Sequence, residues 1–242
     1  MTDSNVSFYE VGGCVRDSLL GIRSKDIDYS VEAPSYEAMK RAIVLRCGGD
    51  PDNADSVAAI VKVEKPEFAT IRAVDPKRGG VDFVLCRKDG FYSDGRRPDS
   101  VTMGTLADDL ARRDFTVNAL ARADDGQIID LFGGQRHLKL RLLVCVGDTE
   151  KRMREDALRM LRALRFHLTK GFTLGAELSA FLECQDNAEL LAKVSIERVR
   201  EELVRCFDYN TPEALVMLNR FYHIRNHVFS RNLKLIPTVF QK

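Results

Sequence analysis

The stretch "YEVGGCVRDSLLGIRSKDIDYSV", from Tyr9 to Val31, combines a Gly-Gly turn with two aspartates separated by one residue. Its residue order predicts a strand, a glycine turn, a short helix and a second strand. Alternate side chains of a strand share one face, so Asp26 and Asp28 project together. Two carboxylates this close raise each other's pKa unless a positive charge lies between them.

A divalent cation between the carboxylates would remove this repulsion. Ligation by oxygen atoms alone suits Mg²⁺, with Mn²⁺ as the alternative. Asp82, in "GGVDFVLC", is the best placed third acid on a neighbouring strand. Two metal ions can hold the attacking and leaving oxygens of a phosphoryl displacement. Asp26, Asp28 and Asp82 are therefore the candidate catalytic and metal-binding residues.

Gly12 and Gly13 fit the same chemistry, because glycines at a strand-to-helix turn let backbone N–H groups approach a phosphate. Arg16 would add a positive charge beside a leaving pyrophosphate. Taken singly, an Asp-x-Asp pair is usually a surface turn or strand edge, and a Gly-Gly pair is usually only a turn. Their order within seventeen residues favours a phosphate site.

The rest of the chain changes from strand patterns to helical patterns. Further strands are expected at 56–64, 68–74 and 81–86, and helices at 15–20 and 35–44. From Leu106 onward the pattern is helical, at 105–121, at 148–168, from Ser195 and again beyond Pro212. A strand-rich part followed by a helical part indicates an α+β fold.

Composition is typical of a soluble globular protein, with 45% hydrophobic and 30% charged residues among 242. No apolar run reaches membrane-spanning length, and the N-terminus lacks a signal pattern. Six scattered cysteines predict buried, reduced thiols and a cytoplasmic protein. The net charge is +1, yet the segment from Arg136 to Lys170 contains ten Lys/Arg and only four Asp/Glu. That segment either attracts polyanions or is an ordinary solvated helix surface.

Several motifs together resemble one known family. Gly12-Gly13-x-Val15-Arg16-Asp17, then Leu20-Gly21, then Lys25-Asp26-x-Asp28 are similar to the head signature of class II tRNA nucleotidyltransferases. These are the CCA-adding enzymes and the related bacterial poly(A) polymerases. Further family-like blocks follow in order: "RRDFTVNALA", "DLFGG", "REDALRMLRALRF" and "SIERVREEL".

The resemblance implies a nucleotidyltransferase (polymerase beta-like) head with a mixed β-sheet and helices, followed by an all-helical neck and short body. We expect the head at 1–140, the nucleotide-selecting neck at 141–207 and a truncated body segment at 208–242 without a tail domain. The grip on the RNA would then come from the basic C-terminal segment, a homodimer or another chain.

Within these blocks the resemblance assigns roles to single residues. Arg112, Arg113 and Asp114 would handle the incoming nucleotide, the arginines through triphosphate oxygens and Asp114 through ribose hydroxyls. Asn118, expected one helical turn further on, would support them. Asp130 would form part of a hinge. Gly133 would be the other member of the hinge. For the charged residues Arg112, Arg113 and Asp114, the alternative is an ordinary solvent-facing surface.

Asp156 and Arg159 lie three residues apart and, on one continuous helix, would address the same base edge. An Asp acceptor beside an Arg donor matches cytosine and adenine, whereas uracil and guanine would leave the carboxylate facing a carbonyl. An i,i+3 salt bridge is the alternative. Arg162 and Arg165 would meet RNA phosphates or support the helix.

The expected activity is the metal-dependent addition of C and/or A nucleotides from CTP and ATP to the 3′ end of tRNA. Partial enzymes that add only C or only A come next. Poly(A) polymerase and a non-catalytic RNA-binding module are the remaining alternatives. The expected partners are tRNA and nucleoside triphosphates, with no membrane and with a homodimer as one option.

Overall fold

The computed structural model describes residues 5–24, 26–90, 100–231 and 233, and these residues form two compact units. The first unit contains the described residues up to Gly90 and Ser100–Leu138, and the second contains those from Lys139 onward. The predicted boundaries at 140 and 207 remain predictions.

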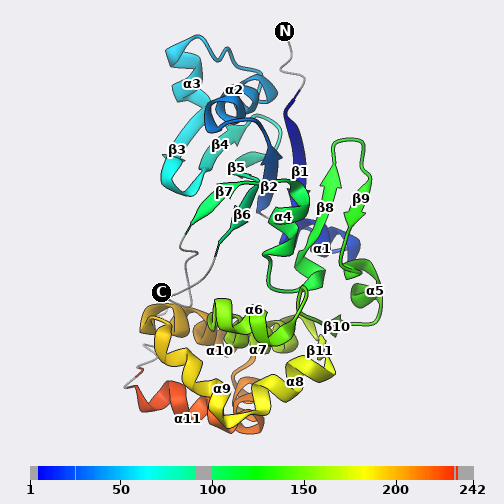
Figure 1. Cartoon of the computed structure of the whole chain (residues 1–242), viewed down its shortest axis with the longest axis vertical. Coiled ribbons are helices and arrows are strands. Elements are labelled where there is room, and N and C mark those ends of the chain that lie inside the picture. The colour runs from blue at the N-terminus through cyan, green and yellow to red at the C-terminus, as the bar shows by residue number, and fades with distance from the viewer. Residues whose placement is uncertain (1–4, 25, 91–99, 232, 234–242) are drawn as a thin grey trace, which may run out of the picture. The chain divides into compact units, whose positions relative to one another are not determined.

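A mixed seven-stranded sheet forms the centre of the first unit, in the order β3-β4-β5-β2-β1-β8-β9 (Figure 1). Its strands are β1 Ser7–Val11, β2 Ile27–Glu32, β3 Val61–Lys65, β4 Thr70–Asp75, β5 Gly79–Leu85, β8 Leu120–Ala123 and β9 Ile128–Asp130. Within this sheet β2 and β5 run parallel, and the other neighbours run antiparallel. The mixed sheet confirms the expected fold class.

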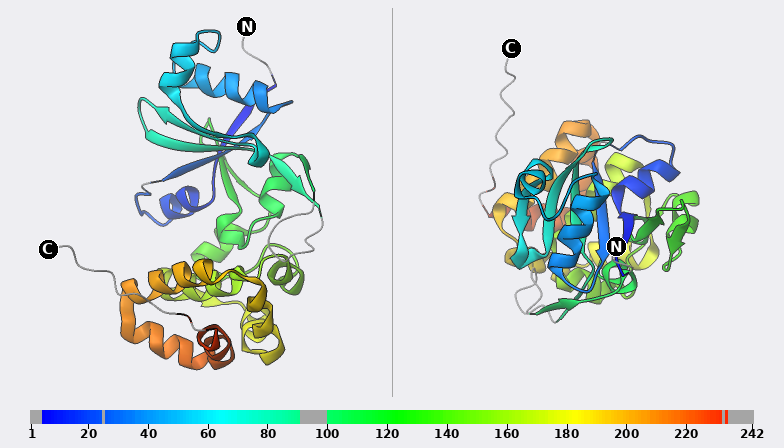
Figure 2. Two further views of the ribbon diagram at one scale, coloured as in Figure 1. Left: turned by 90° about the vertical axis from the view of Figure 1, so that its left-hand side faces the viewer. Right: turned by 90° about the horizontal axis from the view of Figure 1, so that it is seen from above.

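Helices cover both faces of this sheet (Figure 2). Helices α2 (Tyr36–Arg46) and α3 (Ala54–Ile60) bury apolar residues against one face, where Tyr29 and Phe83 belong to the core. Helices α1 (Gly13–Leu19) and α4 (Leu106–Ala111) lie on the other face. Because strand residues alternate, the even-numbered residues of β2 and β5 point away from the α2–α3 core.

Two predictions in this unit were wrong. Residues 56–64 are not one strand, because α3 runs to Ile60 before β3 begins. The side chain of Asn53 accepts hydrogen bonds from the backbone N–H of Asp55 and Ser56, and this N-cap starts the helix. Residues 105–121 are not one helix either. Helix α4 ends at Ala111, a 3₁₀ turn covers Thr116–Asn118, and β8 then joins the sheet.

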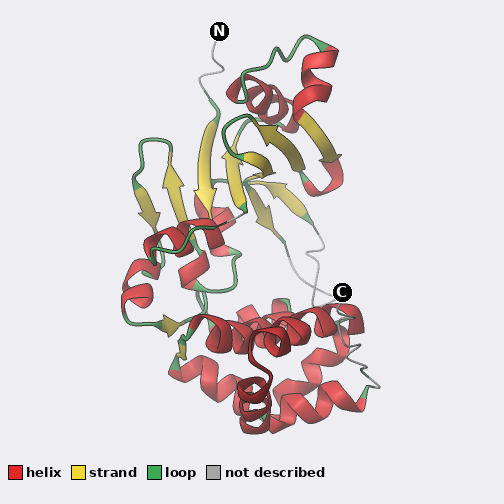
Figure 3. Cartoon of the chain, turned by 180° about the vertical axis from the view of Figure 1, so that it is seen from behind, coloured by secondary structure: helices red, strands yellow, loops and turns green. Residues whose placement is uncertain are grey.

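The second unit is mostly helical (Figure 3). Its helices are α6 Thr149–Glu155, α7 Leu158–Lys170, α8 Ala176–Glu183, α9 Gln185–Ala188, α10 Ile196–Arg220 and α11 Tyr222–Ser230. A short parallel pair, β10 Leu142–Leu143 with β11 Thr173–Leu174, departs from the all-helical expectation. The helix expected at 148–168 is interrupted at Asp156, whose φ of −147° and ψ of 100° are extended. Pro212 lies inside α10, which is kinked at Asn210.

The smaller elements are a two-stranded sheet of β6 (Arg87–Asp89) and β7 (Val101–Met103), helix α5 (Gly134–Lys139), and 3₁₀ turns at Pro66–Phe68 and Glu189–Lys193. No helix among the described residues is both long and apolar enough to cross a membrane. All six cysteines are free, as expected, and five are buried. Cys184 is exposed, which corrects the expectation of six buried thiols.

Candidate active site

The predicted carboxylates lie on the face of the sheet opposite the α2–α3 core. Asp28 of β2 is directly opposite Asp82 of β5 in the parallel register. Asp26 lies one residue before β2 begins. Arg72 of β4 is the register partner of Asp82 on the other side, with Nη1 3.7 Å from Asp82 Oδ2. The folding of three strands therefore brings together residues that are far apart in sequence.

Negative charge accumulates at this position. The pKa of Asp28 is raised, first by partial desolvation and then by the charge of Asp82, with a smaller contribution from Asp26. Arg113 and Arg72 act in the opposite direction. Among the described residues, no three His, Cys, Asp or Glu side chains are already gathered closely enough to hold a metal ion. The donor chemistry of the Asp28–Asp82 pair nevertheless fits a hard divalent cation.

Arg112 and Arg113 are anchored by a carboxylate that the sequence motifs did not single out. Asp109 is completely buried, and its Oδ1 accepts hydrogen bonds from Nε and Nη2 of Arg112 at 2.9 and 2.5 Å. Its Oδ2 accepts from Arg113 Nη2 at 3.0 Å and from the Ser30 hydroxyl at 2.7 Å. Two guanidinium groups over one carboxylate leave a net positive charge beside β2.

Gly12 lies against the same Arg113 side chain. Gly12 has a φ of 76°, in the left-handed region that favours glycine. A Cβ atom at Gly12 would lie 2.8 Å from Arg113 Nη1, whereas one at Gly13 would lie 3.5 Å from Arg16 Nη2. The first glycine of the pair is therefore required by space and by backbone conformation, and the second is not.

We expect Gly12→Ala to lower nucleotide-transfer activity about tenfold or more and to destabilise the fold by about 1–3 kcal/mol, because a φ of 76° with a ψ of −128° is a backbone conformation that glycine alone adopts readily. Displacement of Arg113 explains the larger effect on activity. Gly126→Ala is the matched control, since Gly126 also has a positive φ, of 88°, but nothing lies within 4 Å of an added Cβ there. It should lose stability and retain activity. Initial rates and urea unfolding of both variants measure the difference. Equal losses of activity from the two substitutions would contradict this assignment.

Arg16, Asn118 and Asp114 form a buried hydrogen-bonded chain. Arg16 donates through Nη1 to Asn118 Oδ1, and Asn118 Nδ2 donates to Asp114 Oδ1 at 2.9 Å. Arg16 also pairs with Asp17, at 2.7 Å. The expected contact between Asn118 and Asp114 is present, but the expected reason was wrong. Both lie in the segment between α4 and β8, with Asn118 in its 3₁₀ turn, and not on one helical face.

The two hinge residues belong to the first unit. The carboxylate of Asp130 accepts hydrogen bonds from the backbone N–H of Gly134 at 2.7 Å and of Gln135 at 2.9 Å, which caps α5. Gly133 has a φ of 72° and so adopts the left-handed conformation. Their role as a hinge remains a prediction.

In the second unit, Asp156 and Arg159 have separate partners. The expectation of one continuous helical face was wrong, because Asp156 lies in the break between α6 and α7. Asp156 Oδ2 accepts from Arg198 Nη2 at 3.0 Å. Arg159 Nη1 donates to Glu155 Oε2 at 3.0 Å and to the Arg152 carbonyl at 2.6 Å. Base selection by this pair remains a prediction.

Arg162 and Arg165 both lie close to the buried carboxylate of Glu202. Arg165 Nε donates to Glu202 Oε2 at 2.5 Å, and Arg162 Nη1 lies 3.7 Å from Oε1. Both guanidinium groups also stack over the ring of Phe166. These contacts support the structural alternative for both residues. Part of the positive charge between residues 136 and 170 is therefore compensated by a carboxylate inside this unit.

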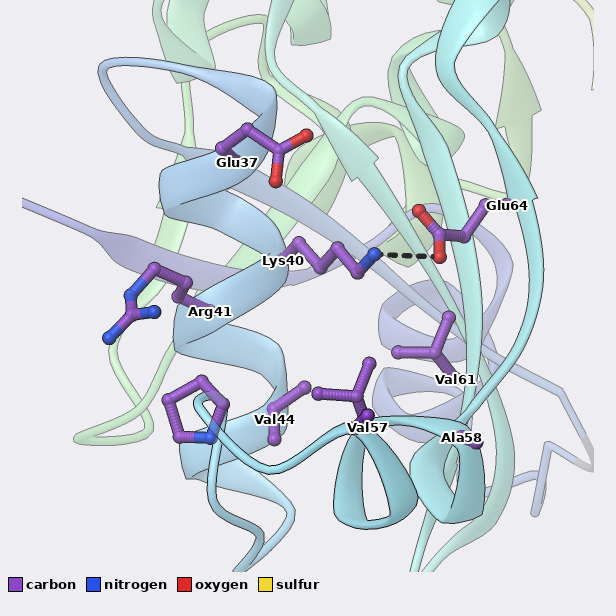
Figure 4. A pocket seen from close by; sticks show the side chains of 10 residues that line it. Glu37, Lys40, Arg41, Val44, Val57, Ala58, Val61 and Glu64 are labelled. Atoms are coloured by element: carbon purple, nitrogen blue, oxygen red, sulfur yellow. Dashed lines mark ion pairs between the residues drawn. The ribbon is translucent and has the colours of Figure 1, made fainter.

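A pocket of about 490 Å³ lies between α2, α3 and β3 (Figure 4). Its apolar side chains include Val44, Val57 and Val61, and Lys40 Nζ pairs with Glu64 Oε1 across it at 2.9 Å. Glu64 is the register partner of Ile71, a residue of the α2–α3 core. The pocket is therefore on the face of the sheet opposite the carboxylates and is not part of the candidate site.

Sequence reasoning missed the residues that hold the site in place. Asp109 and Ser30 anchor the two arginines, while Glu155 and Arg198 hold the pair in the second unit. A signal existed for Asp109, since it lies three residues before Arg112 and four before Arg113, within helical reach of both. Ser30 carried a weaker signal, its same-face spacing from Asp28.

A mixed sheet with acidic residues paired on its central parallel strands defines a nucleotidyltransferase head. The chain belongs to the family of the poly A polymerase head domain, whose model matches residues 8–144. A second model, described as the probable RNA and SrmB-binding site of polymerase A, matches residues 171–233.

The curated proteins that are similar to this chain include CCA-adding enzymes. The CCA-adding enzyme of Levilactobacillus brevis is 38% identical over 206 residues, covering 85% of this chain and 47% of that protein. The CCA-adding enzyme of Lacticaseibacillus paracasei is 41% identical over 198 residues, covering 81% of this chain and 45% of its own length. This chain thus spans about half the length of the curated relatives it matches.

Solved structures agree with these matches. The Bacillus stearothermophilus CCA-adding enzyme in complex with CTP superposes with a TM-score of 0.67 at 34% identity, over 88% of this chain and 47% of that one. The Thermotoga maritima CCA-adding enzyme complexed with tRNA superposes with a TM-score of 0.71 at 27% identity, over 93% of this chain and 49% of that one.

Proposed function

We propose that this chain adds C and A nucleotides to the 3′ end of tRNA, taking them from CTP and ATP with release of pyrophosphate. The observation that carries the proposal is the register pairing of Asp28 and Asp82 on the face of the head sheet opposite the α2–α3 core. The CCA-adding enzymes among its relatives, one solved with CTP and one with tRNA, support this substrate choice.

Asp26, Asp28 and Asp82 would hold Mg²⁺, or alternatively Mn²⁺. The bound metal would neutralise the carboxylates and polarise the reacting oxygens. Asp82 accepts the proton of the RNA 3′-hydroxyl, whose oxygen attacks the α-phosphorus of the nucleotide. The bond to the bridging oxygen breaks, and pyrophosphate leaves. The net positive charge of the Arg112–Arg113–Asp109 group favours the developing negative charge of this leaving group.

The bound nucleotide would be oriented by residues of the same unit. Gly12, Gly13 and Arg16 would border the triphosphate, together with Arg112 and Arg113. Asp114 would accept a hydrogen bond from the ribose and thereby favour NTP over dNTP, while Asn118 keeps its carboxylate in place. The Asp130–Gly133 segment would act as the hinge when the selected base changes from C to A.

Asp156 and Arg159 would choose the base. Each is held by a charged neighbour, Asp156 by Arg198 and Arg159 by Glu155, so their orientations are fixed before a nucleotide arrives. A base with an exocyclic amino group beside a ring-nitrogen acceptor satisfies both side chains. A base with a carbonyl there sets one acceptor against another and forms no hydrogen bond with the carboxylate, at a cost of about 1–3 kcal/mol.

Three tRNA transcripts, ending before CCA, after C and after CC, test the proposal. Each is incubated with the protein, Mg²⁺ and one labelled nucleotide among CTP, ATP, UTP and GTP, and product lengths are read on a sequencing gel. Addition that stops at CCA and excludes U and G is the expected result. Size-exclusion chromatography with light scattering of the same preparation determines whether the chain forms a homodimer, which is one of the options for holding the RNA.

Other products would identify the alternatives. Long A tracts would indicate a poly(A) polymerase, the enzyme after which the matching head-domain family is named. Products extended only by C, or only by A, would indicate a partial enzyme. No extension of any transcript, together with retained tRNA binding, would leave the non-catalytic RNA-binding module.

A further inference from the structure

Arg72 lies beside the candidate metal site but has no role in the proposed reaction. It lies in the register row Asp28–Asp82–Arg72–Val63, which crosses β2, β5, β4 and β3 on the face of the carboxylates. Its side chain is 56% exposed, so its guanidinium reaches solvent beside the candidate metal site. The 3.7 Å separation from Asp82 is an ion pair without a hydrogen bond.

The two sides of the carboxylate pair differ in what surrounds them. On the β1 side, Arg113 contacts Ser30 of β2 and leaves too little room for a side chain at Gly12. Its Nε is buried and has no hydrogen-bond partner among the described residues. On the β4 side, Arg72 lies across Gly80, where an added Cβ would be 3.6 Å from Nη2. Two positive groups therefore flank the carboxylates from opposite sides.

The geometry of phosphoryl transfer assigns different substrates to these sides. The attacking and leaving oxygens lie roughly in line through the phosphorus atom. If the leaving pyrophosphate lies on the β1 side, beside Arg113, then the attacking 3′-hydroxyl approaches from the β4 side. The terminal ribose of the acceptor RNA carries a phosphate on its 5′ oxygen, and this phosphate is the anionic group of the RNA nearest the attacking hydroxyl.

We infer that Arg72 binds a phosphate of the 3′-terminal nucleotides of the acceptor RNA and so orients the attacking hydroxyl. This inference rests on the proposed function. Val63 and Val74 lie beside Arg72 and are 44% and 39% exposed, which adds apolar surface next to the cation. A positive group beside apolar surface matches a single-stranded nucleotide, which presents a phosphate together with a ribose and a base.

The full chain carrying Arg72→Ala tests the inference through two measurements, its affinity for RNA and its KM for CTP. We expect binding of a labelled tRNA transcript ending in CC, followed by fluorescence anisotropy without nucleotide, to weaken about tenfold through loss of one charge-assisted contact. The slope of log K against log salt concentration should become shallower by about 0.7, the value for one single-strand phosphate contact. The KM for CTP should change less than twofold.

Two further variants sharpen the result. Arg72→Lys keeps the charge and should restore the salt slope and most of the affinity. Arg41→Ala is the matched control, since it removes an exposed arginine from α2 on the opposite face and should leave the slope unchanged. Circular dichroism melting checks that each variant is folded, which is expected because Arg72 is largely exposed.

The other possible results would overturn either the role of Arg72 or the proposed function. Unchanged RNA affinity and salt slope in Arg72→Ala, with wild-type extension intact, would overturn the role of Arg72 alone. So would a loss of kcat or of CTP affinity with RNA binding preserved, because Arg72 would then act on Asp82 or on the triphosphate. A wild-type chain that neither binds nor extends the transcript would overturn the proposed function itself.

Discussion

Asp28→Asn is expected to reduce nucleotide transfer by about a thousandfold or more, since several kcal/mol of metal-dependent transition-state stabilisation are lost. The same substitution should leave the metal-free protein at least as stable as wild type. Asp28 faces Asp82 in register, and the pKa of Asp28 is raised by desolvation and by that neighbouring charge. Removing the carboxylate therefore removes a repulsion from the folded state.

The pH dependence of this effect has a definite sign. Because the folded-state pKa of Asp28 lies above its ordinary value of 3.8, the folded protein binds this proton more tightly than the unfolded chain. The resulting stabilisation is complete below the ordinary value and is lost as the pH rises through the raised value. Melting in EDTA between pH 3 and 7 should show this loss in wild type, and Asp28→Asn should lack it.

Asp208→Asn, an exposed site on α10, controls for the removal of one negative charge. It should retain wild-type activity and the wild-type dependence of stability on pH. If Asp28→Asn transferred nucleotides at the wild-type rate, the assignment of the carboxylates would be wrong. If it melted well below wild type in EDTA at pH 7, the carboxylate repulsion would not be the controlling effect.

Asp109→Asn is expected to have the largest effect on stability, a loss of about 3–5 kcal/mol. The carboxylate of Asp109 is completely buried and pairs with both Arg112 and Arg113, so its removal takes a shared counter-charge away from two guanidinium groups. Because Ser30 and Arg113 would also lose their orientation, the affinity for CTP should fall. Urea denaturation and equilibrium CTP binding measure the two effects.

The sign of the pH dependence is opposite to that of Asp28. Burial alone would raise the pKa of Asp109, but Arg113 and Arg112 hold it below the ordinary value of 3.8. The stability from this group is present above that value and is lost as the pH falls through the depressed one. Asp108→Asn is the adjacent control, where a half-buried carboxylate of the α4 capping box is removed at a cost of about 1 kcal/mol. Equal losses from both substitutions would refute the anchoring role.

Residue order alone is enough to predict the strand, glycine turn and helix around the first motif, the α+β class and the family. These features are local or are carried by contiguous blocks. The alternation of residues in β2 likewise predicts that Asp28 and Tyr29 point to opposite faces of the sheet. The sequence predicts the ends of the helices less well. The break at Asp156 and the helix that begins after Asn53 depend on single backbone conformations and caps, which periodicity does not reveal.

Which charged groups meet is a property of the folded chain. Asp28 and Asp82 are 54 positions apart, and the parallel register of β2 with β5 makes them neighbours. The same sheet order places Arg72 beside Asp82, and the packing of α4 brings Arg113 to Ser30. A charged residue shows its type in the sequence but not its partner, because partners are selected by strand register and by the burial of otherwise uncompensated charge.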